Sequence, residues 1–252
     1  METKKVGLQI FSIRDIYFRD PVEAFKLISE CGYDAVEMSG SIVISAEELK
    51  KILDNFGLEC CGWQAPWDYM SRSDLLEMFA LYNKVIGNKF LILPELPNEL
   101  RQDEYAWLKA SYKITEVAAR LKKYGMRTGI HSHKYEFRPI EDGEESPRDI
   151  LMQNTCGNVV LQLDTGDAYA AGINPAEILR KYPGRAQTIH IKPYSNTKGR
   201  NAVIGDDDID WEEVVKLCSE QGKTEYFIIE YEEDDAKTGI KTCIENFRKY
   251  IL

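Results

Sequence analysis

Short runs of β-forming residues alternate with helical patterns along this chain, and every predicted return from helix to strand contains a glycine. We expect eight strands, at Val6–Phe11, Ala35–Met38, Leu58–Gly62, Phe90–Leu93, Met126–Ile130, Val159–Leu163, Ala186–Ile191 and Tyr226–Ile229. The returns contain Gly32, Gly57, Gly87, Gly125, Gly157, Gly184 and Gly222. A glycine just past a helix end supplies the left-handed residue that stops the helix. Strands that alternate with helices in this way pair in parallel through right-handed crossovers.

The segments between the strands carry apolar residues at helical spacing. One example is the set Leu49, Ile52, Leu53 and Phe56. Two further segments begin with a capping residue followed by proline, at Asp20-Pro21 and at Asn174-Pro175. That order is typical of a first helical turn.

Eight such units can either lie open as a doubly wound sheet or close into a barrel. An open sheet usually carries a glycine-rich phosphate loop after its first strand, whereas this chain has Ser12-Ile13-Arg14-Asp15. Eight units in 252 residues match a (β/α)₈ TIM barrel. We see no linker or composition break, so we expect a single domain over residues 1–252. The longest connection, Pro193–Asp210, has the length of a functional loop.

The charge balance constrains the partners. The chain has 32 Lys and Arg against 42 Asp and Glu, a formal net charge of -10. Such a surface repels nucleic acid and anionic lipid, so we expect neither as a partner. The six cysteines are scattered, and we expect them to be reduced and mostly buried in a cytoplasmic protein. A homodimer is the expectation from base rates alone.

All three histidines of the chain, His131, His133 and His190, fall at the predicted ends of strands five and seven. Active sites of TIM barrels lie at these strand ends. Asp164 and Glu230 follow strands six and eight, and imidazole with carboxylate suits a divalent first-row metal. We therefore predict one ion, Mn²⁺, Zn²⁺, Co²⁺ or Mg²⁺, held by His131, Asp164, His190 and Glu230. The alternative is a polar hydrogen-bonded network without a metal.

Four motifs resemble those of a known family. They are Gly129–Phe137, Leu163–Gly166 with Ala170–Pro175, His190–Lys192, and Ile229–Glu232. On these residues the chain resembles the xylose isomerase-like barrels, in particular the sugar phosphate isomerase/epimerase group with its inosose isomerases, inosose dehydratases and ketose 3-epimerases. The resemblance runs from Val6 to Glu232. It implies a metal ion held by strands five to eight and a small sugar, keto-sugar or inosose as substrate.

This chain departs from the family pattern at several positions. Many ketose epimerases carry a metal-binding glutamate that also moves a proton where this chain has His131. Asp167 stands where histidine or tryptophan is common, and Trp63 and Gln64 stand where the third strand often offers histidine. The aspartate that usually follows the His190–Lys192 motif is replaced by Pro193. The barrel and the metal therefore carry over from the family, while the particular reaction stays open.

We assign the remaining polar and aromatic side chains at the strand ends provisional roles. Glu230 or Glu136 would move a proton, and Lys192 would balance charge on an enediolate oxygen. Substrate contacts would come from Glu37, Trp63, Gln64, Trp67, His133, Asp167 and Arg200. Each of these can instead be an ordinary core, surface or hydrogen-bonded residue.

These roles describe a metal-dependent isomerase or epimerase that acts through an enediolate. One alternative is a lyase or dehydratase that expels a hydroxyl or glycosidic oxygen from a keto-sugar or keto-glycoside. The other is a non-catalytic sugar-binding subunit. A metal nuclease fits poorly, because the chain is acidic and has only three histidines.

Overall fold

The computed structural model describes residues 4–140, 143–221, 223–233 and 235–251. Its eight strands all pair in parallel and form one sheet in the order β6-β5-β4-β3-β2-β1-β8-β7. The strands are β1 (Lys5–Gln9), β2 (Ala35–Ser39), β3 (Glu59–Gln64), β4 (Phe90–Leu93), β5 (Arg127–His131), β6 (Val160–Gln162), β7 (Thr188–Ile191) and β8 (Tyr226–Ile229).

The two edge strands, β6 and β7, meet at a short seam. The backbone N of His190 donates to the carbonyl of Leu163 at 2.8 Å, and the backbone N of Leu161 donates to the carbonyl of Arg185 at 2.8 Å. An isolated parallel bridge pairs Asp164 with His190. The sheet is thereby nearly closed into a barrel, which confirms the predicted fold.

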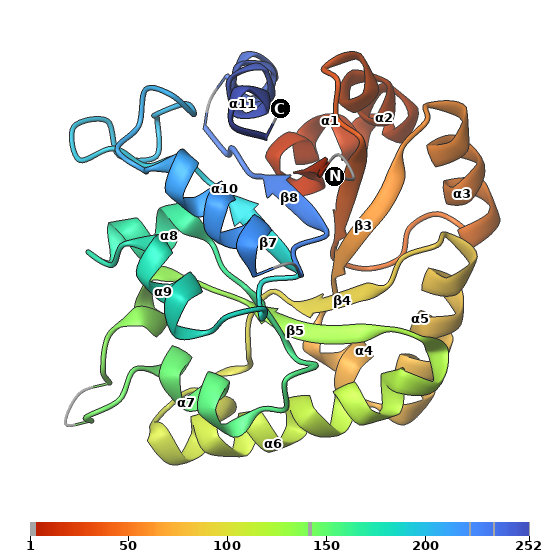
Figure 1. Ribbon diagram of the computed structural model, residues 1–252. Coiled ribbons are helices and arrows are strands. Elements are labelled where there is room, and N and C mark those ends of the chain that lie inside the picture. Colours follow the sequence, from red (N-terminus) through yellow and green to blue (C-terminus); the bar gives the residue numbers. More distant parts are fainter. Residues whose placement is uncertain (1–3, 141–142, 222, 234, 252) are drawn as a thin grey trace.

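The helices lie around the outside of the strands (Figure 1). They are α1 (Arg14–Arg19), α2 (Pro21–Glu30), α3 (Ala46–Asn55), α4 (Trp67–Ser71), α5 (Ser73–Val85), α6 (Glu104–Leu121), α7 (Pro147–Asn154), α8 (Thr165–Ala170), α9 (Pro175–Lys181), α10 (Trp211–Glu220) and α11 (Ala236–Ile251). Short 3₁₀ segments are η1 (Ile10–Ile13), η2 (Asn98–Leu100), η3 (Lys122–Tyr124) and η4 (Lys134–Phe137). Asp20 and Asn174 cap α2 and α9, as predicted.

The predicted strand and turn positions hold with small differences. The first strand ends at Gln9 rather than Phe11, because the Gln9 side chain accepts from the backbone N of Phe11 and starts η1. Positive φ angles, as expected for helix stops, occur at Gly32, Gly57, Gly87, Gly125 and Gly184. Gly157 does not have a positive φ, so that expectation was wrong, and Gly222 lies outside the described residues.

Two layers of apolar side chains flank the strands. On β4, Leu91 and Leu93 belong to the large core shared with the helices, while Phe90 and Ile92 face the barrel interior with Val160. Four of the six free cysteines are buried, namely Cys60, Cys61, Cys218 and Cys243. In the described part of the chain, no helix combines the length and apolarity needed to cross a bilayer.

Gly129 allows β5 and β6 to approach each other closely. A Cβ at this position would lie 2.1 Å from the carbonyl oxygen of Val160, a backbone atom that cannot swing away. We expect Gly129→Ala to destabilise the protein by about 3 kcal/mol, the upper end for overpacking. The matched control is Gly157→Ala, where nothing lies within 4 Å of an added Cβ. That change should stay within about 0.5 kcal/mol in urea unfolding, and equal effects of the two variants would contradict this interpretation.

Candidate metal centre

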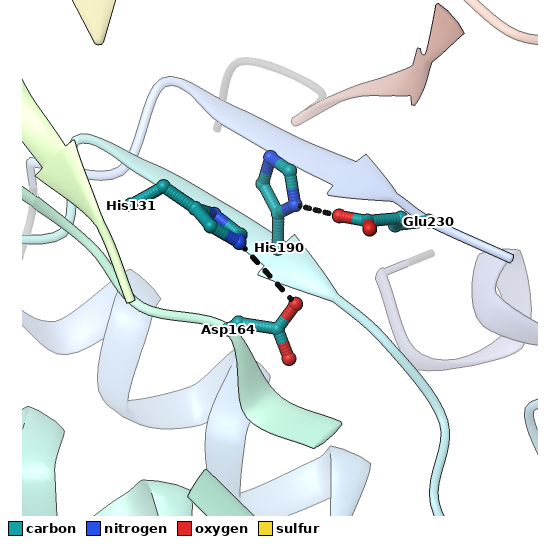
Figure 2. Close-up of side chains that lie close together, drawn as sticks. All are labelled: His131, Asp164, His190 and Glu230. Atoms are coloured by element: carbon teal, nitrogen blue, oxygen red, sulfur yellow. Dashed lines mark hydrogen bonds and ion pairs between the residues drawn. The ribbon is translucent and has the colours of Figure 1, made fainter. Parts of the chain in front are cut away.

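Four side chains from neighbouring strand ends converge at the mouth of the barrel (Figure 2). They belong to His131 at the end of β5, Asp164 just after β6, His190 within β7 and Glu230 just after β8. One ligand atom from each lies within 4.8 Å of the others, and all four residues are buried. The structure therefore brings together the four side chains that the sequence analysis selected.

One oxygen of Asp164 shows why this cluster suits a cation. Its Oδ1 accepts from the backbone N of Asp167 at 2.7 Å and caps α8. Its Oδ2 is buried without a hydrogen-bond partner among the described residues, 3.8 Å from Nε2 of His131 and 3.9 Å from Nζ of Lys192. A buried carboxylate oxygen is costly unless a donor or a cation satisfies it. Two imidazole nitrogens and two carboxylate oxygens fit a divalent first-row metal.

Two hydroxyl groups fix the backbone at the seam that carries these residues. The Ser132 hydroxyl accepts from the backbone N of Asp164 at 2.7 Å. The Thr165 hydroxyl lies 3.0 Å from both the backbone N and the carbonyl oxygen of Lys192. Gly166 keeps the approach close, because a Cβ there would lie 2.9 Å from the Lys192 carbonyl oxygen. The Ser132 contact joins the ends of β5 and β6, and the contacts of Thr165 and Gly166 with Lys192 join the ends of β6 and β7.

His190 lies between two carboxylates. Its Nδ1 is 2.5 Å from Oε2 of Glu230, and its Nε2 is 2.7 Å from Oε2 of Glu37. Burial lowers the pKa of His190, but Glu37 and Glu230 outweigh that effect and raise it to about 10. Between these partners the imidazole is protonated on both nitrogens at neutral pH, so binding a metal through Nδ1 displaces a proton.

His131 has the opposite electrostatic environment. Burial and the neighbouring His190 hold the pKa of His131 well below its usual range, so the ring is neutral. Its Nδ1 lies 3.2 Å from Oε1 of Gln162, and its Nε2 faces Asp164. A neutral imidazole offers one lone pair, which is the form that binds a metal.

Lys192 lies beside the cluster and pairs with two carboxylates. Its Nζ is 2.9 Å from Oε1 of Glu230 and 2.7 Å from Oε1 of Glu232. Burial favours the neutral amine, but these carboxylates and Asp164 outweigh it and raise the pKa of Lys192. Burial likewise raises the pKa of the Glu230 carboxyl, but Lys192 and His190 together hold it well below its usual range. Lys192 is therefore a buried cation and Glu230 a buried anion.

Glu37 and Trp63 are both buried, in different surroundings. Glu37 is fully buried beneath the histidines. The Trp63 ring packs edge-on against Phe79 and Tyr82 on the helix side of the sheet, and its Nε1 donates to the carbonyl of Gly40 at 2.8 Å. Trp63 is therefore corrected to a core aromatic, whereas Glu37 is a buried partner of His190 whose predicted substrate contact stays a prediction.

The remaining strand-three residues are less deeply packed. Gln64 extends inward, where its Nε2 donates to Oε1 of Gln162 at 3.2 Å. Trp67 begins α4 and is partly buried against the core. Neither side chain is shown to contact a substrate, so both roles stay predictions.

Glu136 lies outside the four-residue cluster. It is fully buried in η4, and its Oε2 forms an ion pair with the guanidinium of Arg148 on α7. Its Oε1 lies 3.7 Å from Nδ1 of His133. His133 is partly exposed, stacks on Tyr135 and meets His131 edge-on with ring centroids 5.0 Å apart. Glu136 thus lies beside His133 without a hydrogen bond to it, and its pairing with Arg148 leaves it poorly placed as a mobile base.

Asp167 and Arg200 bond to each other. The guanidinium of Arg200, on the long connection after β7, binds Oδ1 of Asp167 in the first turn of α8. This ion pair ties the connection to the mouth of the barrel. Both side chains were predicted to meet substrate, and neither is shown to contact one, so both roles stay predictions.

Two residues that shape the site, Gln162 and Arg148, were not predicted from the sequence. Gln162 is the one polar residue in the predicted strand Val159–Leu163, and a lone polar side chain in a buried strand signals an interior hydrogen bond. Arg148 follows Ser146-Pro147 at the start of a helix, where charged residues are ordinarily exposed. Nothing in the sequence distinguished it from a surface arginine.

Comparison of the chain with models of known protein families identifies its family. The family model described as "Xylose isomerase-like TIM barrel" matches residues 25–250. The chain belongs to this family. The resemblance drawn from the four sequence motifs is therefore confirmed.

Individual proteins are similar to this chain over nearly its whole length. An inosose dehydratase of Geobacillus kaustophilus is 25% identical, with 98% of this chain and 90% of that protein covered. A crystal structure of a sugar phosphate isomerase/epimerase from Parabacteroides distasonis has a TM-score of 0.81 at 20% identity and covers 100% of this chain and 96% of that one. The IOLI protein, whose crystal structure is described with a binding zinc atom, has a TM-score of 0.70 at 16% identity, with 98% of both chains covered.

We expect a metal that binds this cluster to release protons. His190, with a pKa of about 10, must lose one proton, and Asp164, whose pKa burial raises to about 7, loses another at lower pH. Affinity should therefore rise as the pH rises through about 7 and on toward 10. Titration calorimetry of Zn²⁺ in buffers of different ionisation enthalpy measures the release, which should be about one proton per ion at pH 8. Affinity that is independent of pH would exclude these ligands.

We expect Arg148→Met to destabilise the protein by about 3–5 kcal/mol, because it leaves the Glu136 carboxylate buried without its partner. The double variant Arg148→Met with Glu136→Leu should recover most of this loss, since neither charge remains. Urea unfolding of both variants measures the free energy of unfolding. A loss below about 1 kcal/mol in the single variant would show that the ion pair is not what fixes Glu136.

Proposed function

We propose that this chain is a divalent-metal-dependent enzyme that isomerises or epimerises a small keto-sugar or inosose through an enediolate. The observation that carries the proposal is the buried set of His131, Asp164, His190 and Glu230 with the Lys192 ammonium against it. A divalent ion bound to this set would polarise a substrate carbonyl and favour loss of the adjacent C–H proton. The names of the similar proteins, inosose dehydratase and sugar phosphate isomerase/epimerase, support a sugar or inosose as substrate.

Glu230 is the better of the two candidate bases. It lies at the mouth within the cluster, whereas Glu136 is fully buried and paired with Arg148. Lys192 donates to Glu230 and can also donate to an oxygen that gains negative charge beside it. We therefore assign proton abstraction to Glu230 and oxyanion stabilisation to Lys192. His133, which is partly exposed at the rim, would contact substrate hydroxyls.

Dehydration is the second candidate, and the asymmetry of the site favours it. Two-sided epimerisation needs a base on each face of the substrate carbon, and the strand-five ligand here is the neutral His131. A β-elimination instead needs one base and one acid. Glu230 would take the C–H proton, the electron pair would form a C=C bond, and the hydroxyl would leave as water with a proton from Lys192. The dehydratase relative, which matches 98% of this chain, supports the same reading.

The two reactions differ in their products. Protein loaded with Mn²⁺ or Zn²⁺ is incubated with inososes and ketoses in deuterated water and followed by NMR and mass spectrometry. An isomerase or epimerase yields an isomer that carries solvent deuterium, whereas a dehydratase yields a product that has lost one water. Exchange that survives full removal of metal by chelator would refute the metal-dependent proposal, and binding without any exchange would indicate a sugar-binding subunit.

We expect Lys192→Met to lower kcat about 10²-fold or more, within the usual range for a group that handles a proton or its charge. The matched control is Lys198→Met on the same connection, whose exposed ammonium pairs with Asp206 away from the cluster. That variant should keep kcat within about twofold, since exposed pairs contribute little. Equal kinetics for the two variants would remove Lys192 from the mechanism.

A further inference from the structure

Glu37 on β2 joins both histidines of the cluster through one buried carboxylate. Its Oε2 lies 2.7 Å from Nε2 of His190 and accepts from Nε2 of Gln9 at 2.5 Å. Its Oε1 accepts from Nε2 of Gln162 at 2.6 Å, and Gln162 in turn contacts His131. Glu37 is fully buried, so its carboxylate is satisfied by protein groups alone.

The chemistry of these groups fixes the direction of every hydrogen bond. An ionised carboxylate only accepts, so Gln162 must turn its NH₂ group toward Glu37. The same nitrogen donates to Oγ1 of Thr188 at 3.1 Å. The amide oxygen of Gln162 then faces Nδ1 of His131 at 3.2 Å, and because a carbonyl oxygen only accepts, that Nδ1 carries the hydrogen.

The consequence for the metal ligands follows directly. With its hydrogen on Nδ1, His131 keeps its lone pair on Nε2, the nitrogen that faces Asp164. His190 donates Nε2–H to Glu37 and keeps Nδ1 on the side of Glu230. The free lone pair of His131 therefore points into the cluster, and so does the lone pair that Nδ1 of His190 exposes once it releases its proton.

We propose that Glu37 is a positioning residue that selects the metal-binding nitrogen of both histidines, Nε2 of His131 through Gln162 and Nδ1 of His190 directly. The inference rests on the proposed metal site and adds to it the group that prepares its two nitrogen ligands. Partners behind metal-binding histidines typically change metal affinity 10–100-fold. Here one carboxylate, that of Glu37, would set the metal affinity of both histidines.

Gly62 on β3 supports a fixed position for Glu37. A Cβ at Gly62 would lie 2.6 Å from Oε1 and 3.1 Å from Cγ of Glu37. The register of β2 and β3 shifts between Val36 and Glu37, and this places Gly62 directly opposite Glu37. Gly62→Ala should therefore displace the Glu37 carboxylate and weaken metal binding, although Gly62 itself makes no polar contact with the cluster.

Nitrogen NMR of the wild-type protein tests the assignment without any substitution. The chain has only three histidines, so the ring nitrogens can be resolved in ¹H–¹⁵N long-range spectra of the Zn²⁺-loaded protein. We expect Zn²⁺ on Nε2 of His131 and on Nδ1 of His190, with hydrogen on the opposite nitrogens. Ligation through Nδ1 of His131 or Nε2 of His190 would overturn the inference.

Variants then test the dependence on Glu37. In Glu37→Gln the amide can donate as well as accept, so both rings should lose their fixed hydrogen positions and Zn²⁺ affinity should fall 10–100-fold. Gln162→Leu should disturb only His131, while Thr188→Val, the matched buried control, should keep affinity within about threefold, because the bond from Gln162 to Glu37 remains.

The outcomes separate this inference from the metal site itself. If wild-type protein binds no Zn²⁺, both the site and the inference fail. If Zn²⁺ binds but Glu37→Gln changes neither its affinity nor either ring, only the inference fails. If Glu37→Gln does not fold, Gln162→Leu and Gly62→Ala provide the same test. Unchanged His131 nitrogen signals in Gln162→Leu would overturn the proposal that Glu37 acts on His131 through Gln162.

Discussion

The constraint that governs this structure is charge balance in a buried polar layer at the mouth of the barrel. Three carboxylates, those of Glu37, Asp164 and Glu230, are buried with the Lys192 ammonium and the His190 ring. Buried charges persist only when they are paired and hydrogen-bonded. A doubly charged cation, taken up as His190 releases its extra proton, would bring the charge of these five side chains to zero. The low dielectric of this layer raises the free-energy cost of burying the charges, and it also strengthens their electrostatic interactions with each other and with a bound substrate.

The interior of the barrel is divided along its axis by the alternation of residues within each strand. Phe90 and Ile92 of β4 and Val160 of β6 form part of an apolar interior, and Gln162 of β6, two residues on from Val160, belongs to the polar layer. Because inward positions recur every second residue, a strand changes from apolar to polar simply by changing the residue at the next inward position. The apolar interior holds the scaffold, and the polar layer above it carries the candidate chemistry.

The sequence was sufficient for the strand order along the chain, the barrel and the four converging side chains, because repeated βα units and histidines at strand ends are local patterns. It was insufficient where pairing between strands decides the outcome. The register shift opposite Glu37 aligns Trp63 with Met38, a residue of the outer core, and so turns the indole toward the helices. Glu136 matches its motif, but only the fold brings Arg148 to it, since twelve positions along the chain separate them and no local pattern links them.

The seam between β6 and β7 is the sparsest join between neighbouring strands, and it carries both Asp164 and His190. An ion bound by these two residues would join the two edge strands across the opening of the barrel. Occupancy of the site and closure of the barrel would then be coupled. The stability of the barrel against opening at this seam would depend on the concentration of the ion around it.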